Sequence, residues 1–280
     1  MPYATFDFLP HALTQGLCSG TLAPYLGPEV LSLCETVPVP STPLALATFL
    51  NAKTSVPGKI RNRLTAVAQF IENFKHRKTL VGAMNEAFAA TPPPSSLHRW
   101  LATLPSAVIV DTWYDDTMRG ALVGRQDWSE VQGLSQSEHF GTWVGWYTAA
   151  GTLSPDPLAT TTVLYKPWGA HGPASNYLVS DTDYVEVLTE IDIQTPIPTL
   201  VQERRTELGF VFLGCRFNDQ LPRAFARQIM KRSKGPHYAV LPEAPTRMEA
   251  RFLEEQGISR IAMPLAVAAE RLCASAAVEA

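Results

Sequence analysis

The stretch AVIVDTWYDD, residues 107–116, combines a short apolar run with a polar end. Its first four residues are apolar without alternation, a pattern typical of a strand that is buried on both faces of a parallel sheet. A turn and a helix from Asp115 to about Val123 are expected to follow. Similar apolar runs at 21–26 and 210–214 predict further buried strands.

Predicted strands and helices alternate throughout the outer parts of the chain. Further strands are expected at 140–148, 160–165, 237–241 and 258–263, and helices at 10–19, from about 30, and at 180–190, 219–231, 246–256 and 265–274. This alternation favours an α/β fold with a parallel, Rossmann-like sheet and helices on both faces. Residues 44–104 show only helical patterns. We therefore expect a Rossmann-type domain formed by residues 1–43 and 105–280, with an all-helical insertion at 44–104.

The composition excludes several classes of protein. The chain has 280 residues, 46% of them hydrophobic, which is typical of a globular protein and not of a disordered one. A net charge of −3 provides no positive field to hold nucleic acid or an anionic membrane. The four cysteines lie far apart, so no metal site is expected. Because no apolar run approaches the roughly 20 residues that span a bilayer, and the N-terminus lacks a signal-peptide pattern, we expect a cytoplasmic protein.

Four segments, in this order, resemble the sirtuin-like domain family of bacteria. They are LAPYLGPEVL at 22–31, VIVDTWYDD at 108–116, YKPWG to DY between 165 and 184, and FVFLGCRFND with HYAV between 210 and 240. The resemblance implies a nucleotide-binding sheet, NAD or ADP-ribose as ligand, and NAD-dependent deacylation or NAD hydrolysis as the family's activity. The family's nucleotide-site positions fall on Gly27, Pro28, Glu29, Thr112, Asp115, Gly214 and Cys215.

The phosphate loop departs from the family's Gly-Ala-Gly-x-Ser pattern. Pro28 has no backbone N–H, and Glu29 replaces the second glycine. A carboxylate facing a diphosphate is repulsive, by about 4 kcal/mol for two unit charges about 4 Å apart at an effective dielectric near 20. Alternatively, Glu29 faces solvent and caps the next helix, where the helix dipole favours a negative charge.

Two tryptophans occupy the positions where the family has its most important polar residues. By the resemblance, Trp113 stands at the asparagine of the nicotinamide pocket, and Trp168 stands at the histidine that acts as general base. An indole has an N–H donor and no acceptor, so it cannot take a proton. Each indole either fills the core or stacks on a ligand ring. We expect the two tryptophans to lie close together at the carboxyl ends of the central strands.

Other candidate residues have simpler structural interpretations. His171 is a possible substitute for the missing base, or simply part of a loop turn. Cys215 fits a small buried hydrophobe better than a nucleophile. Asp115 and Asp116 fit charges at a helix N-terminus better than metal ligands. The basic residues between 223 and 234 fit a solvated helix face.

Two hypotheses for the function follow from these departures. The first is a degenerate sirtuin-like protein, or pseudoenzyme, that binds or regulates a protein partner and has no catalytic residues. The second is an NAD glycohydrolase or protein deacylase that uses a displaced base such as His171. The two hypotheses differ in whether an acceptor points into the pocket at the strand ends.

Overall fold

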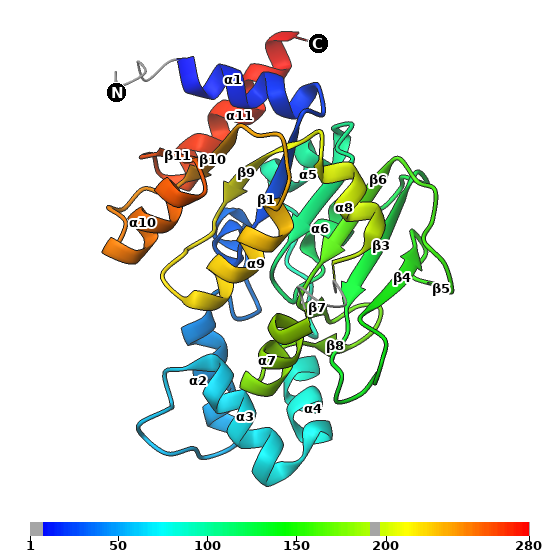
Figure 1. The fold of residues 1–280 in the computed structure, drawn as a ribbon, viewed down its shortest axis with the longest axis vertical. Coiled ribbons are helices and arrows are strands. Elements are labelled where there is room, and N and C mark those ends of the chain that lie inside the picture. Colours follow the sequence, from blue (N-terminus) through cyan, green and yellow to red (C-terminus); the bar gives the residue numbers. More distant parts are fainter. Residues whose placement is uncertain (1–7, 191–196, 280) are drawn as a thin grey trace.

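The computed structural model describes residues 8–190 and 197–279 (Figure 1). Within these residues a nine-stranded sheet has the order β11-β10-β9-β1-β2-β6-β3-β4-β5. Its strands are β1 (Leu22–Leu26), β2 (Val108–Asp111), β3 (Trp128–Gly133), β4 (Val144–Thr148), β5 (Leu153–Ser154), β6 (Thr162–Lys166), β9 (Gly209–Leu213), β10 (His237–Val240) and β11 (Ile258–Ile261). The short strands β7 (Gly169–Ala170) and β8 (Asn176–Tyr177) form a separate hairpin.

The helices alternate with the strands from β9 onward, as the sequence predicts, but none lies between β3 and β8 in the described residues. They are α1 (Phe8–Cys18), α2 (Pro43–Lys53), α3 (Leu64–Lys75), α4 (Arg77–Ala87), α5 (Ser96–Thr103), α6 (Thr117–Ala121), α7 (Asp181–Glu190), α8 (Thr199–Arg205), α9 (Gln220–Met230), α10 (Arg247–Glu255) and α11 (Leu265–Glu279). The helix expected from about residue 30 is instead a short 3-10 helix, η1 (Pro28–Leu33), which begins at Pro28 after the single residue Gly27 that follows β1.

The central strands run parallel, which confirms the α/β, Rossmann-like fold. Tyr25 of β1 pairs with Val110 of β2 on one side and with Phe212 of β9 on the other. Only the pairings of β3 with β4 and of β4 with β5 in this sheet are antiparallel among the described residues, so one edge departs from the expected parallel arrangement. The chain moves to opposite sides of β1 to form β2 and β9. Ligands of such sheets bind at the carboxyl ends of the strands around this switch.

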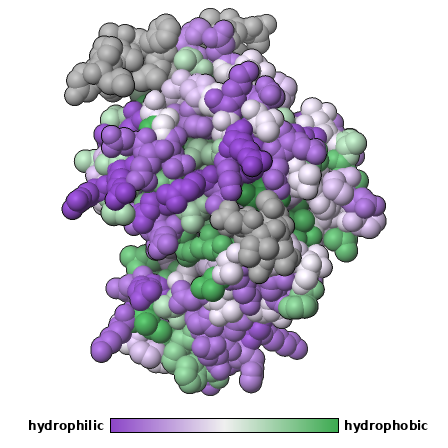
Figure 2. All heavy atoms as spheres, in the orientation of Figure 1, coloured by the Kyte–Doolittle hydropathy of each residue, from purple (hydrophilic) through white to green (hydrophobic). Residues whose placement is uncertain are grey.

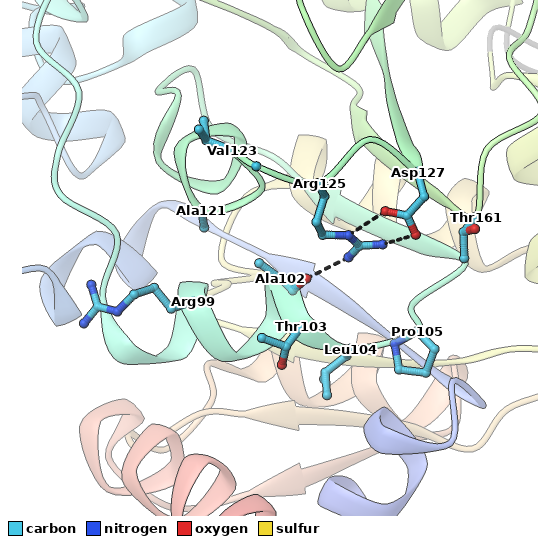
Figure 3. Close-up of a pocket in the computed structure, with 11 residues that line it drawn as sticks. Arg99, Ala102, Thr103, Leu104, Pro105, Ala121, Val123, Arg125, Asp127 and Thr161 are labelled. Atoms are coloured by element: carbon cyan, nitrogen blue, oxygen red, sulfur yellow. Dashed lines mark hydrogen bonds and ion pairs between the residues drawn. The ribbon is translucent and has the colours of Figure 1, made fainter.

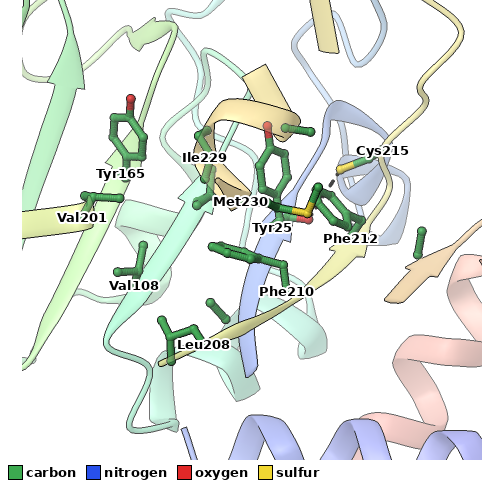
Figure 4. Close-up of a cluster of buried hydrophobic side chains, with 14 of the residues drawn as sticks. Tyr25, Val108, Tyr165, Val201, Leu208, Phe210, Phe212, Cys215, Ile229 and Met230 are labelled. Atoms are coloured by element: carbon green, nitrogen blue, oxygen red, sulfur yellow. Dashed lines mark hydrogen bonds between the residues drawn. The ribbon is translucent and has the colours of Figure 1, made fainter. Parts of the chain in front are cut away.

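Helices cover both faces of the sheet. On one face, side chains such as Val108 and Phe210 pack against α8 and α9 through Val201 and Ile229 (Figure 4). On the other face, the strands pack against α1, α5, α6 and α11. The central strands β1, β2, β6 and β9 therefore contribute apolar side chains in both directions, which explains the unbroken apolar runs in the sequence.

Helices α2, α3 and α4 pack together and against α7, below the sheet in Figure 1. Thr42 starts α2 because its side chain accepts a hydrogen bond from the N–H of Ala45, with Pro43 in the first turn. In contrast, α5 contacts α6 and α11 beside the sheet. The division into 1–43 with 105–280, and 44–104, stays a prediction. Figure 2 shows apolar side chains gathered at the narrowing where α2, α3 and α4 meet the part of the molecule that contains the sheet.

Candidate functional site

The ends of β1 and β9 approach each other closely at the predicted phosphate loop. A Cβ atom on Gly27 would lie 2.3 Å from the carbonyl oxygen of Gly214, a distance that no real side chain tolerates. Gly214 itself has φ of +65°, in the region that favours glycine. The fold therefore requires both glycines for the approach of the two strand ends.

This approach occupies the backbone amides of the loop. The N–H of Gly27 donates to Leu213 O at 2.9 Å, that of Glu29 to Gly214 O at 3.1 Å, and that of Val30 to Gly27 O at 3.2 Å. Pro28 has no N–H to offer. Amides that cradle a phosphate must point at it unpaired. The loop 27–30 therefore does not present the donor set of a phosphate-binding loop.

The side chain of Glu29 is half-buried in the first turn of η1. Burial raises the pKa of its carboxyl, and the charge of Arg216 partly opposes this. Arg216 is itself bound to two other carboxylates, Glu243 at 2.6 Å and Glu249 at 3.2 Å. The carboxyl of Glu29 therefore lies near the place where the resemblance expects a diphosphate, and Arg216 is not free to neutralise an anion there.

The remaining nucleotide-site positions use their polar atoms inside the protein. Thr112 donates from both its N–H and its hydroxyl to Leu26 O at 2.9 Å. Asp115 is buried, and its Oδ1 accepts the N–H of Thr117 at 2.9 Å, at the start of α6. The Sγ of Cys215 lies 3.5 Å from Tyr25 O, and burial raises its pKa well above the ordinary value (Figure 4). Cys215 is therefore a protonated packing residue.

Trp113 and Trp168 belong to one buried aromatic cluster, as expected from the sequence. Tyr114 connects them, with its ring centroid 5.0 Å from that of Trp113 and 6.4 Å from that of Trp168. The indole N–H of Trp113 donates to Pro40 O at 2.8 Å. The indole N–H of Trp168 has no acceptor among the described residues. Neither side chain offers an acceptor for a proton.

The space around Trp168 is filled. Tyr184 and Phe225 place their rings edge-on to this indole at 5.9 and 5.8 Å. A cavity beside Phe225, lined also by Gly133, Trp143, Tyr165, Pro167, Leu178, Val187 and Ile197, measures about 10 Å³. That volume holds at most one water molecule.

His171 lies in the turn between β7 and β8 and faces the start of α6. Its Nδ1 is 3.0 Å from Oδ2 of Asp116, and the N–H of Gly172 donates to Oδ1 of the same aspartate at 3.1 Å. The side chain of His171 is 30% exposed. Asp116 therefore orients a histidine 55 residues away. The sequence interpretation of Asp116 as a helix charge had missed this role.

A buried ion pair joins the ends of β2 and β6. Lys166, 1% exposed, donates from Nζ to Asp111 Oδ2 at 2.7 Å and to Asp115 O at 2.8 Å. Burial raises the pKa of Asp111 to about 6, against the opposing charge of Lys166. Burial also lowers the pKa of Lys166, but the two aspartates outweigh it and the net shift is upward. In the sequence, the apolar runs of β2 and β6 end in residues of opposite charge, Asp111 and Lys166, and this pattern could have predicted the pair.

A second buried polar group lies on the same face of the sheet as the ion pair of Lys166 and Asp111. Glu130 and Gln132 of β3 are fully buried, and Arg119 of α6 forms an ion pair with Glu130. The guanidinium of Arg119 also lies over the ring of Trp128, 5.6 Å from its centroid. Sequence reasoning did not find this group because it did not identify β3.

A surface groove of about 600 Å³ lies at the opposite end of the sheet (Figure 3). Asp127 and Thr161, which directly precede β3 and β6, form part of its lining. Arg125 holds both oxygens of Asp127 at 2.8 and 2.9 Å and donates to Ala102 O at 2.7 Å. The groove is therefore separate from the strand ends where the nucleotide site was predicted.

Residues 8–190 and 197–279 contain neither a group of metal ligands nor a helix that could span a membrane. No group of three or more His, Cys, Asp or Glu side chains there could hold a metal ion. No helix in these ranges is long and apolar enough to cross a bilayer.

Comparison with known proteins identifies the family. The SIR2-like domain matches residues 107–261, more than half of the chain, from the residue before β2 to the last residue of β11. The match includes the positions of Trp113, Trp168 and His171, while the loop 27–30 precedes it. A search of curated proteins finds no match. With this sheet and this match, the chain belongs to the family of SIR2-like domains.

Proposed function

We propose that this SIR2-like protein has a degenerate nucleotide site and acts as a non-catalytic binding or regulatory protein. The observation that carries the proposal is the loop 27–30, whose amides donate to the protein's own carbonyl groups or, at Pro28, do not exist. NAD and ADP-ribose, which the family implies, do not fit the loop in this arrangement.

The missing donors matter energetically. A hydrogen bond to a charged group contributes about 1.5–3 kcal/mol. Losing two such bonds removes about 3–6 kcal/mol, out of the roughly 8 kcal/mol of a micromolar complex. An ionised Glu29 carboxyl would oppose a diphosphate further. Weak or undetectable nucleotide binding follows.

The position of the family's base supports the same proposal. Trp168 cannot accept a proton, and general-base catalysis usually contributes about 10²- to 10⁴-fold to a rate. The edge-on rings of Tyr184 and Phe225 also fill the volume beside it. We therefore expect neither NAD hydrolysis nor deacylation.

Nicotinamide release by the purified protein tests this expectation. We expect a rate equal to that of a heat-denatured control, with and without an acylated peptide. Release well above the control would reject the non-catalytic function.

One observation favours the alternative, an NAD-consuming enzyme with a displaced base. His171 and Asp116 form a histidine–carboxylate pair at 3.0 Å, and the imidazole is partly exposed. Such a pair fixes the orientation and the tautomer of a general base. If nicotinamide release occurs, His171→Ala should abolish it and Asp116→Asn should reduce it. Release that survives His171→Ala would exclude the displaced base as well.

We further propose a protein partner and a bacterial, cytoplasmic setting. The net charge of −3 does not favour nucleic acid or an anionic membrane as the partner. Co-purification from cells followed by mass spectrometry identifies such a partner. Recovery of nucleic acid in place of protein would contradict this part of the proposal.

A further inference from the structure

The buried group on β3 is connected to the turn that carries His171. The amide Nε2 of Gln132 donates to Oε1 of Glu130 and also to the carbonyl oxygen of Gly172, at 2.6 Å for the latter. Gly172 in turn donates its N–H to Asp116. A single side-chain amide therefore links a fully buried carboxyl to the backbone of the β7–β8 turn.

The same amide leaves one polar atom without a partner. Oε1 of Gln132 is buried and accepts no hydrogen bond from the described residues. An ionised Glu130 cannot satisfy it, because a carboxylate only accepts. A protonated Glu130 carries one O–H, which an amide oxygen can accept. To receive that O–H, the amide of Gln132 must turn over, and this rotation moves Nε2 away from Gly172.

We propose that Glu130 and Gln132 form a proton-dependent latch on the β7–β8 turn. With Glu130 ionised, Nε2 of Gln132 bonds both the carboxylate and Gly172, and the turn is held. When Glu130 takes up a proton from solvent, its O–H donates to Oε1 of the rotated amide, and Gly172 is released. The inference does not depend on whether the protein binds NAD.

The environment of Glu130 places its proton exchange near neutral pH. Burial raises the pKa of Glu130 to about 7, although Arg119, the amide of Gln132 and Lys166 oppose the shift. The titratable and charged groups that face it are Arg119 from α6, Asp116 directly before α6, Lys166 from β6, Tyr147 from β4 and, through Asp116, His171 from the turn. The latch therefore opens as the pH falls through about 7.

Amide hydrogen exchange of a peptide covering 169–176, corrected for intrinsic rates, tests the latch. Between pH 8 and pH 6 we expect protection of this segment to fall about 2- to 10-fold, the loss that one hydrogen bond of about 0.5–1.5 kcal/mol produces. Glu130→Gln should show low protection at both pH values. Gln132→Met should do the same, which keeps the test decisive if Glu130→Gln folds poorly.

Two matched variants separate the latch from other causes. Glu249 is another buried glutamate paired with an arginine, but the pKa of its carboxyl is lowered. The variant Glu249→Gln should therefore keep the parent's pH step, which is the fall in protection between pH 8 and pH 6. His171→Gln should also keep the step. The latch is excluded if the parent shows no step, if the step persists in Glu130→Gln or Gln132→Met, or if it disappears in His171→Gln.

Discussion

At the residue scale, the protein stabilises buried charges by pairing them across strands. Lys166 is the clearest example, because its ammonium group reaches both Asp111 and the backbone of Asp115. Such pairs add little net stability compared with apolar residues, but breaking one leaves an uncompensated charge in the core. The pair therefore affects stability mainly when one of its partners is removed.

Replacing Lys166 with Met should destabilise the protein by about 3–5 kcal/mol at pH 8. The loss should be smaller at pH 5, because Asp111, whose pKa is already raised to about 6, is then protonated and needs no counter-charge. Urea unfolding at both pH values measures the difference. Adding Asp111→Asn to the variant should recover part of the loss; no recovery would mean that packing, and not charge, causes it.

His98 should make the stability of the fold depend on pH. It is buried, with Nδ1 2.7 Å from Oγ of Ser95, and burial lowers its pKa from 6.5 to about 4. Because the unfolded chain binds the proton first, this contribution is complete above about pH 6.5 and is lost as the pH falls toward 4. The loss amounts to about 3 kcal/mol.

Unfolding of the parent and of His98→Gln between pH 4.5 and 7.5 isolates this contribution. Asp111 acts in the opposite direction, because a raised carboxyl pKa lowers stability as the pH rises, so only the difference between the two proteins is informative. The variant should lose less stability on acidification than the parent. Parallel curves for the two proteins would contradict the assignment.

At the scale of the elements, one arginine joins α4 to α7 and to the loop before β4. Arg77 lies 2.8 Å from the buried Asp183 of α7 and 3.3 Å from Glu138. Asp183 also accepts the N–H groups of Val179 and Ser180. Removing the guanidinium leaves this carboxylate buried without its counter-charge.

We expect Arg77→Met to cost about 3–5 kcal/mol in the free energy of unfolding. Lys53→Met is a suitable control, because Lys53 and Glu86 form an exposed pair between α2 and α4, and such pairs contribute about 0–1 kcal/mol. Equal effects of the two substitutions on urea unfolding would show that Arg77 has no special role.

The close contact between Gly27, at the end of β1, and Gly214, at the end of β9, gives a second prediction at this scale. Gly27→Ala places a methyl group against Gly214 O and should prevent stable folding or separate the two strand ends. Gly82→Ala in α4, where a Cβ meets nothing within 4 Å, should stabilise by about 0.5–1 kcal/mol. Thermal unfolding compares the two. A Gly27→Ala protein as stable as the parent would disprove the tight contact.

The sequence predicts those strands whose buried side chains are mostly apolar. Strands β1, β2 and β9 appear as apolar runs because both of their faces are covered. Strand β3 escaped prediction because its buried positions include Glu130 and Gln132, which are tolerated only with Arg119 supplied by α6. Whether Arg119 reaches Glu130 depends on how α6 packs against the sheet, and a local sequence pattern does not predict that packing.

At the scale of the whole molecule, the sequence predicts where residues stand relative to the strands better than which atoms they contact. Gly27 and Gly214 directly follow β1 and β9, and Asp115 lies in the turn between β2 and α6. The partner of each polar atom depends on the register between strands and on η1. The bond from Glu29 N–H to Gly214 O, which underlies the proposed loss of phosphate binding, could therefore not be predicted from the sequence.

The most direct test of the central claim is a calorimetric titration of the unmodified protein with ADP-ribose, which contains the diphosphate but not the nicotinamide that Trp113 and Trp168 would obstruct. Because the amides of loop 27–30 are engaged in bonds to the protein's own carbonyl groups, we predict no binding at micromolar concentrations of ligand. Saturable binding with a micromolar or lower Kd would show that the loop opens and still serves a nucleotide, and would contradict the account.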